Sequence, residues 1–310
     1  MDISIWVWVG FTAFIVAMLA IDLLLDRGKG APTLRRSIAW SLVWIGLGVG
    51  FAGILWAWQG GNAAGEYTAG YLIEKSLSVD NVFVFAVIFT ALAVPAAQQK
   101  RVLFWGVLGA LVFRGLFIAA GAALLDAAHF VLYVFAAILL LTAVKLARHS
   151  HINVDPRRNL IVRALGRVMP VTDGYEGNRY LTRRNGVLYA TPLLAALIAI
   201  ETTDVVFALD SIPAIFAITD DPFIVFTSNA FAILGLRALY FLLAGSMAKF
   251  HYLGVGLAGI LGFAGAKMAL SDVWHPPVLL SLGVIVAILT AAVIASIRRD
   301  RRLVPAGGAA

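Results

Sequence analysis

Ionisable side chains lie inside apolar stretches of this sequence, where a hydrophobic segment normally carries none. The acidic ones are Glu74, Asp80, Glu201, Asp204 and Asp210, and the amide Asn81 directly follows Asp80. The basic ones are Lys75, Arg114, Lys145, Arg237 and Lys267. A charged side chain at the centre of a lipid bilayer costs about 3 kcal/mol even on lenient scales, so each needs a partner or a function. We therefore expect these residues to form the functional site.

The spacing of these residues repeats along the chain. The stretches EKSLSVDNVF and DVVFALDSIP each contain an acid, five further residues and a second acid, and each is followed by an arginine and then a lysine. Residues 67–147 and 189–270 therefore look like two copies of one three-helix unit. Because three is an odd number, the second copy must enter the membrane from the opposite side, and inverted repeats of this kind place a substrate site near the midplane. The alternative, ion pairs that only hold helices together, explains one pair more readily than a duplicated series.

The acidic residues offer oxygen ligands to a metal ion. Carboxylates, the Asn81 amide and the hydroxyls of Ser78 and Ser211 favour hard divalent cations such as Mn²⁺, Mg²⁺ or Ca²⁺ over Cu(I) or Zn²⁺. On a straight helix Asp80 points about 120° away from Glu74. Either each acid works with the other repeat, or the helix is broken between them. Pro213 lacks an N–H and frees the carbonyl of Leu209, which favours a break.

The basic residues allow three interpretations. They neutralise the carboxylates when no metal is bound, or they belong to a proton or gating relay, or Arg114 and Arg237 hold an oxyanion. We favour the first, and the density of carboxylates opposes the third.

The elements that must position these residues are membrane helices. The chain has 310 residues, of which 61% are hydrophobic and 13% are charged, whereas a soluble domain has about 25% charged residues. Apolar windows predict nine spans: 4–25, 37–58, 67–93, 100–124, 128–147, 189–218, 223–246, 251–270 and 277–297. We expect an all-α polytopic protein with a single membrane domain over 1–310, a long basic loop at 148–188 and a tail at 298–310. The chain contains no cysteine, which excludes disulfides, thiolate metal sites and iron–sulfur clusters.

The distribution of charge predicts the orientation. Most of the 24 lysine and arginine residues fall in one set of alternating loops, and the opposite loops carry acids such as Asp126, Asp220 and Asp272. The N-terminus is therefore expected outside and the C-terminus in the cytoplasm. This bias accounts for the basic charge without nucleic-acid binding. Within the loop, DPRRNLIVRALGRVMP at 155–170 fits either a short helix on the inner leaflet or a solvated linker.

Signatures of an enzyme are missing from the sequence. There is no HExxH pattern and no serine–histidine combination within the spans. There is also no Walker A sequence, so we expect any transport to be driven by a gradient. We predict no catalytic residues and no resident cofactor.

Four stretches resemble the TerC family of integral membrane proteins: EKSLSVDNVFVFAVIF, ETTDVVFALDSIPAIFAIT, NAFAILGLRALYFLLAG and PVTDGYEGNRY. The resemblance covers about 70–270. It implies a multi-pass protein of the bacterial plasma membrane, of the LysE-like transporter class, that exports manganese, supplies Mn²⁺ to secreted metalloenzymes and is linked to alkaline or tellurite stress. The family's acidic residues carry over onto Glu74, Asp80, Glu201, Asp204 and Asp210, and its asparagine onto Asn81. Buried carboxylates would repel tellurite, so any tellurite tolerance is expected to be indirect.

These observations predict a secondary transporter that exports Mn²⁺, with Asp80 and Asp210 as central ligands and the other acids and Asn81 completing or relaying the site. Two alternatives stay open. One is a non-transporting membrane scaffold that hands Mn²⁺ to the secretion machinery or to secreted metalloproteins, and the other is a Ca²⁺/H⁺ antiporter. The expected partners are thus a divalent metal ion and the lipid bilayer, and the oligomeric state stays open.

Overall fold

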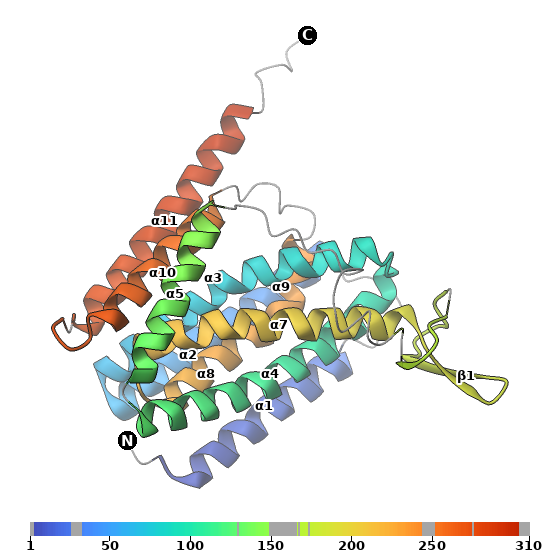
Figure 1. Cartoon of the computed structure of the whole chain (residues 1–310), viewed down its shortest axis with the longest axis horizontal. Coiled ribbons are helices and arrows are strands. Elements are labelled where there is room, and N and C mark those ends of the chain that lie inside the picture. The colour runs from blue at the N-terminus through green and yellow to red at the C-terminus, as the bar shows by residue number, and fades with distance from the viewer. Residues whose placement is uncertain are drawn as a thin grey trace.

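The computed structural model describes residues 3–25, 33–128, 130–148, 166, 168–172, 174–243, 252–274 and 276–303. Its helices are α1 (Ile5–Leu25), α2 (Leu34–Gln59), α3 (Gly61–Ala91), α4 (Ala96–Ala127), α5 (Phe130–Arg148), α7 (Pro192–Phe216), α8 (Pro222–Leu234), α9 (Leu236–Leu243), α10 (Leu253–Ala269) and α11 (Val278–Leu303). Two short strands, β1 (Leu181–Arg184) and β2 (Val187–Ala190), form a hairpin. The helices lie side by side, the hairpin extends from one end, and α5, α10 and α11 are inclined to the rest (Figure 1).

The core is built around α3 and α8. Helix α3 packs against α2, α7, α8 and α11, and α8 is buried on nearly every side, as expected of a helix that is apolar all round. One buried apolar cluster joins α1, α2, α3, α4, α7, α8 and α9. A second joins α3, α4, α5, α7, α8, α10 and α11. Polar groups on α3 and α7 are therefore held inside the protein.

Six of the described helices are long and apolar enough to cross a membrane: α1, α2, α4, α5, α7 and α11. The pair α8–α9 adds a seventh if it counts as one span bent by 41°. Helix α3 carries Glu66, Glu74, Lys75 and Asp80, and α10 has only 17 residues. The chain is thus an all-α, multi-pass membrane protein, while the count of nine spans, the repeats and the orientation stay predictions.

The helix break that the sequence favoured beside the acid pairs was wrong. Helix α3 is continuous from Gly61 to Ala91, and α7 continues through Pro213 to Phe216, because the proline lies in its last turn and removes only one hydrogen bond. The bend falls at Gly235, between α8 and α9. A Cβ atom there would lie 3.0 Å from the Lys75 Nζ and 3.0 Å from the Cβ of Trp44. Glycine thus lets α2 and α3 approach the bend closely.

A β-hairpin precedes α7, where a loop up to 188 and a helix from 189 were predicted. The strands are antiparallel, with Arg184 opposite Val187, and Asn185 and Gly186 have positive φ angles of 50° and 82°. Asn-Gly is the preferred pair for such a two-residue turn. Helix α7 consequently begins at Pro192 rather than at 189. The predicted surface helix at 155–170 lies almost wholly outside the described residues.

The segment before the hairpin is fastened to the ends of α3 and α4. The Tyr175 hydroxyl donates a hydrogen bond to the Leu92 carbonyl (2.7 Å), and the Gln98 amide donates to the Gly177 carbonyl (2.6 Å). Arg101 lies over the ring of Tyr180, whose pKa is raised to about 12 by burial. This end of the helix bundle is thus covered by an ordered cap.

Candidate functional site

Arg114 on α4 joins two acids from different helices in the interior of the protein. Its Nη1 lies 2.6 Å from Oε1 of Glu74 on α3. Its Nη2 and Nε contact the two carboxylate oxygens of Asp204 on α7, at 3.1 Å and 3.3 Å. All three side chains are at most 3% exposed. The bidentate contact to Asp204 fixes the plane of the guanidinium.

Two neutral side chains complete the surroundings of Arg114. Nη1 donates to the Ser211 hydroxyl (3.1 Å) and to the Asn229 amide oxygen (2.7 Å). The Asn229 amide in turn donates to the carbonyl of Val225 (3.0 Å) on the same helix, α8, which settles which amide atom faces the arginine. Asn229 was not among the residues predicted from the sequence. Its only signal was a single amide in the apolar stretch PFIVFTSNAFAIL.

A buried polar face on α3 continues from this group. Glu74, Ser78 and Asn81 follow the i, i+4, i+7 spacing of one helical face and are 0%, 0% and 1% exposed. Among the described residues, the polar side-chain atoms of Ser78 and Asn81 lack a hydrogen-bond partner, whereas Glu74 is held by Arg114 at 2.6 Å. Buried polar atoms without partners are rare and indicate a bound water or ion.

The other predicted ligands lie apart from Arg114 or outside the described atoms. Asp210 is half-buried and accepts a hydrogen bond from Thr142 of α5 (2.8 Å). Glu201 is half-buried against α4, where a Cβ on Gly109 would collide with its carboxylate. The side chain of Asp80 lies outside the described atoms. Within the described part of the chain, no three acidic or histidine side chains are arranged to hold a metal ion.

The remaining basic residues have separate positions. Lys75 donates to the carbonyl of Ala232 (3.2 Å) in the last turn of α8, where a positive charge is favourable. Arg237 forms an ion pair with Asp22 of α1 (2.5 Å). Lys145 is exposed in the last turn of α5. Among the described residues, Arg114 is thus the predicted compensating residue that forms ion pairs with predicted ligands, while Lys145 acts on Asp210 through its charge.

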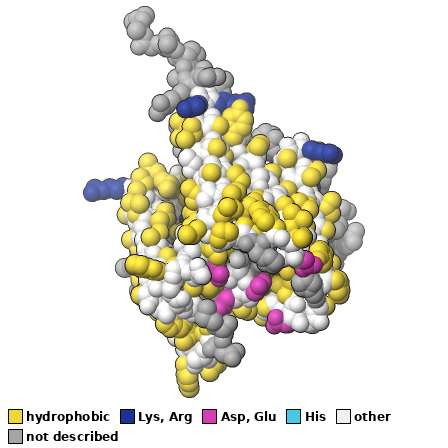
Figure 2. Space-filling view, turned by 90° about the vertical axis from the view of Figure 1, so that its left-hand side faces the viewer, with side chains coloured by type: hydrophobic (Ala, Val, Ile, Leu, Met, Phe, Trp, Pro, Cys, Tyr) yellow, Lys and Arg dark blue, Asp and Glu magenta, His cyan; other side chains and the backbone are white. Residues whose placement is uncertain are grey.

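A cavity of about 570 Å³ lies at the end of the molecule opposite the hairpin. Lys267 lines it together with Asp220 and Asp272, beside the end of α7. Figure 2 shows this end of the molecule, with acidic side chains gathered close together on it. Any cation that leaves the interior beside α7 would meet an acidic surface here.

The buried group combines acidic side chains with neutral oxygen atoms. Lys75 acts on Glu74 and Glu201 acts on Asp204 through their charges. With Arg114 between Glu74 and Asp204, three acids thus face two bases, which leaves an excess negative charge when all are ionised. Buried negative charge in a water-poor interior is costly unless a cation or a proton balances it. The unpartnered oxygens of Ser78 and Asn81 lie on the same helical face as Glu74, and hard cations favour such ligands.

The fold and this group define a multi-pass membrane protein with a charged network in its interior. The profile of the integral membrane protein TerC family matches residues 59–303, so the chain belongs to the TerC family. It is 48% identical over 296 residues to "Uncharacterized membrane protein STKORF319" of Myxococcus xanthus, covering 95% of this chain and 92% of that one. It is 48% identical over 292 residues to "Putative membrane-bound redox modulator Alx" of Escherichia coli K12, covering 91% of each. No solved structure has significant similarity to this chain.

Proposed function

We propose that this protein is a secondary transporter that exports a divalent metal ion, most consistently Mn²⁺, through a site between α3, α4 and α7. The observation that carries the proposal is the convergence of Glu74 and Asp204 on Arg114, beside unpartnered oxygens on α3. The excess of negative charge in this buried group needs a cation or a proton to balance it, and we assign a cation. Oxygen ligands without sulfur select a hard one.

In this proposal Arg114 is an internal counter-ion. Arg114 neutralises part of the negative charge of the acids while no metal ion is bound. When a metal ion binds beside the acids and displaces the guanidinium from them, the guanidinium still donates to the neutral acceptors Ser211 and Asn229. Glu74 and Asp204 are the central ligands, in place of Asp80 and Asp210, with Ser78 and Asn81 adjacent to them. The path of the ion then offers further carboxylates, those of Asp80, Glu201 and Asp210.

The packing of the helices supports a site between two related halves. Helix α3 packs against α8, and α4 packs against α7, while α5 packs against α10. This is the pattern of contacts that a pseudo-twofold relation between α3–α5 and α7–α10 produces. Glu74 and Asp204 are the equivalent first acids of the two halves, so their meeting at one arginine is expected at such an axis.

Transport is tested with the purified full chain in liposomes that contain a fluorophore quenched by Mn²⁺. We expect wild-type protein to admit Mn²⁺ down its gradient and Asp204→Asn to slow uptake at least about tenfold, because losing one charge-assisted contact costs about 1.5–3 kcal/mol. Asp126→Asn is the matched control, since Asp126 is exposed near the end of α4, and it should transport normally.

Two results would contradict the proposal. If a correctly folded Asp204→Asn protein takes up Mn²⁺ at the wild-type rate, the group around Arg114 is not part of the transport pathway. Saturable Mn²⁺ binding by wild-type protein without any uptake would instead identify a scaffold that holds metal. Competition by Ca²⁺ in the same liposomes ranks the two ions as cargo.

A further inference from the structure

The segment GYEGNRY, residues 174–180, takes no part in the proposed transport site. It lies directly before the hairpin, at the end of the molecule from which the hairpin extends (Figure 1). We call residues 174–180 the strap. Its chain reverses in a turn in which the N–H of Arg179 donates to the carbonyl of Glu176 (3.2 Å).

Two hydrogen bonds tie the strap to the ends of α3 and α4. The Tyr175 hydroxyl donates to the carbonyl of Leu92, the residue that directly follows α3 (2.7 Å). In the first turn of α4, the side-chain amide of Gln98 donates to the carbonyl of Gly177 (2.6 Å). Both acceptors are backbone carbonyls.

The strap is also tied to the start of α7. The hydroxyl of Thr191, the N-cap of α7, donates to the carbonyl of Arg179 (2.7 Å). The guanidinium of Arg101 on α4 lies over the ring of Tyr180. The strap thus joins the ends of α3, α4 and α7, which are the three helices that carry the proposed transport site.

The interior between the strap and the site is apolar. Phe89 of α3, Leu103 of α4 and Leu193 of α7 are at most 1% exposed and belong to one buried cluster. Each lies nearer the strap end of its helix than the charged residue of the site on that helix. An ion cannot cross such packing unless the helices move apart. The site is therefore closed toward the strap.

The opposite end of the molecule is hollowed by the cavity of about 570 Å³ that Asp220 lines. A site that is closed at one end, with a cavity at the other, is the arrangement expected of one state of an alternating-access transporter. The other state requires an opening at the strap.

The strap can leave the helices without unfolding them. Gly174 and residues 177–179 are exposed, and Tyr175 and Tyr180 are only half-buried. Segments with few buried contacts and solvent-exposed hydrogen bonds open locally before the core does. Water can replace the strap at the carbonyls and donors that hold it.

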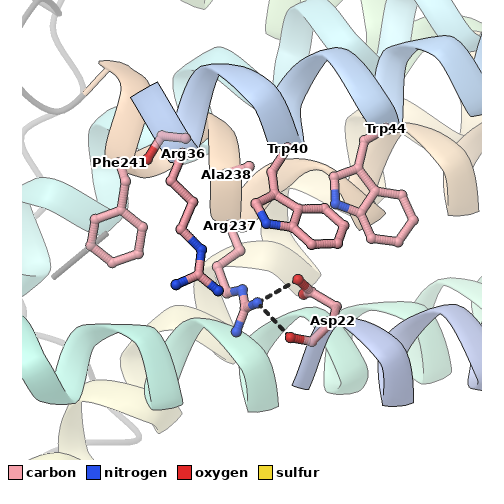
Figure 3. Close-up of a pocket in the computed structure, with 8 residues that line it drawn as sticks. Asp22, Arg36, Trp40, Trp44, Arg237, Ala238 and Phe241 are labelled. Carbon is pink, nitrogen blue, oxygen red and sulfur yellow. Dashed lines mark hydrogen bonds and ion pairs between the residues drawn. The ribbon is translucent and has the colours of Figure 1, made fainter. Parts of the chain in front are cut away.

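Neighbouring contacts hold α9 independently of the strap. Tyr240 of α9 donates to the amide oxygen of Gln99 on α4 (3.0 Å). Arg237 of α9 is ion-paired with Asp22 of α1 (Figure 3). Release of the strap would therefore free the ends of α3 and α7 while α9 stays attached to α1 and α4.

We propose that the strap is the gate of the transport site at the hairpin end of the helices. It holds the ends of α3, α4 and α7 together while the site is closed, and it leaves them when the ion passes. The gate rests on the proposed function, because it is one of the two openings of that same site. In the predicted orientation this opening faces the cytoplasm and admits the ion that is exported.

The test locks the strap with a reversible cross-link. The chain contains no cysteine, so Gln98→Cys combined with Asn178→Cys places one thiol on α4 and one on the strap, beside the contact between Gln98 and Gly177. A short bifunctional thiosulfonate joins the two thiols, and a reductant releases them. In the liposome assay we expect the link to slow Mn²⁺ uptake at least about tenfold, because a lid that cannot open stops turnover, and reduction to restore uptake.

Binding of Mn²⁺ is the second readout. The linked protein in detergent should bind Mn²⁺ with unchanged affinity in calorimetry, because the opposite end of the molecule stays accessible. A matched control carries Arg183→Cys with Leu188→Cys, two positions directly opposite each other within the hairpin. The same reagent joins these thiols without fixing the strap to a helix, and this linked protein should take up Mn²⁺ at the unlinked rate.

Four results would overturn the gate. Uptake by the fully linked strap variant at its unlinked rate would overturn the gate alone and leave the proposed function standing. Equal slowing by the link within the hairpin would do the same. Loss of both binding and uptake in the linked strap variant would show that the link disturbs the site itself. Absence of uptake by the unlinked wild type would contradict the proposed function, and the gate would fall with it.

Discussion

The guanidinium of Arg114 connects α4 to three other helices through Glu74, Asp204, Ser211 and Asn229. A buried ion pair contributes little net stability, because desolvation offsets the attraction between the charges. Removing one partner, however, leaves an uncompensated buried charge and costs about 3–5 kcal/mol. The neutral acceptors Ser211 and Asn229 are therefore important: they satisfy an N–H of Arg114 without adding charge.

Asn229→Leu tests this role at the scale of a single residue. Leucine has a similar branched shape but is larger, and it removes the acceptor 2.7 Å from Nη1, which should lower the free energy of unfolding by about 1–3 kcal/mol. Thermal unfolding in detergent measures the change. Ser228→Ala is the control, because Ser228 is also buried in α8 but bonds only to the Val225 carbonyl. Equal loss of stability in the two variants would show that Asn229 is no more than a packing residue.

At the scale of the helices, α3 approaches its neighbours through small residues. Gly70 allows close contact with α7 and α8, since a Cβ there would lie 3.0 Å from a methyl of Ile215 and 2.9 Å from the Ser228 hydroxyl. Membrane helices often approach each other at such positions. The contact matters for the site because α3 carries Glu74 four residues further along.

Gly70→Ala should therefore destabilise the protein by about 1–3 kcal/mol, because the added methyl forces α3 away from α7 and α8. Gly46→Ala on α2 is the control. A Cβ there meets nothing within 4 Å, so the change should be neutral or stabilise the helix by up to about 1 kcal/mol. Thermal unfolding of both variants gives the comparison. A Gly70→Ala protein as stable as the control would show that α3 can move without cost.

At the scale of the whole molecule, the two ends of the helix bundle differ in their charge and in the segments that cover them. One end carries the hairpin and its docked segment, and the other carries the cavity lined by Asp220 and Asp272. The predicted orientation places the hairpin in the cytoplasm and the acidic end outside. In that orientation the cavity lies where an exported cation would leave the protein.

The absence of cysteine allows this orientation to be tested with single-cysteine variants. Val273→Cys lies before α11 at a position that is 83% exposed, and Val187→Cys lies in the hairpin at 50% exposure. A membrane-impermeant maleimide should label Val273→Cys in intact cells and Val187→Cys only after permeabilisation. The reverse labelling pattern would show that the orientation in the membrane is inverted, and the proposed direction of transport would then change from export to import.

The bounds of most helices could be predicted because apolar windows of membrane length depend on local composition alone. The break favoured at Pro213 was wrong because this proline lies in the last turn of α7. The bend at Gly235 was not predicted, because it depends on how closely Lys75 and Trp44 approach that position. The hairpin was missed although its turn, Asn185-Gly186, was readable. Strand β1 lies in the stretch predicted as a basic loop, and β2 overlaps the start of the span predicted from 189.

The sequence by itself determined that ionisable residues are buried in membrane helices, and that Glu74, Asp204 and Arg114 are among them, because a charge in an apolar segment is visible in composition. Only the tertiary structure decided which of these meet. Arg114 and Arg237 occupy equivalent places in the repeated pattern, yet one contacts both acids and the other pairs with Asp22. The physical reason is that pairing depends on which helix lies opposite each side chain, and packing of whole helices settles that.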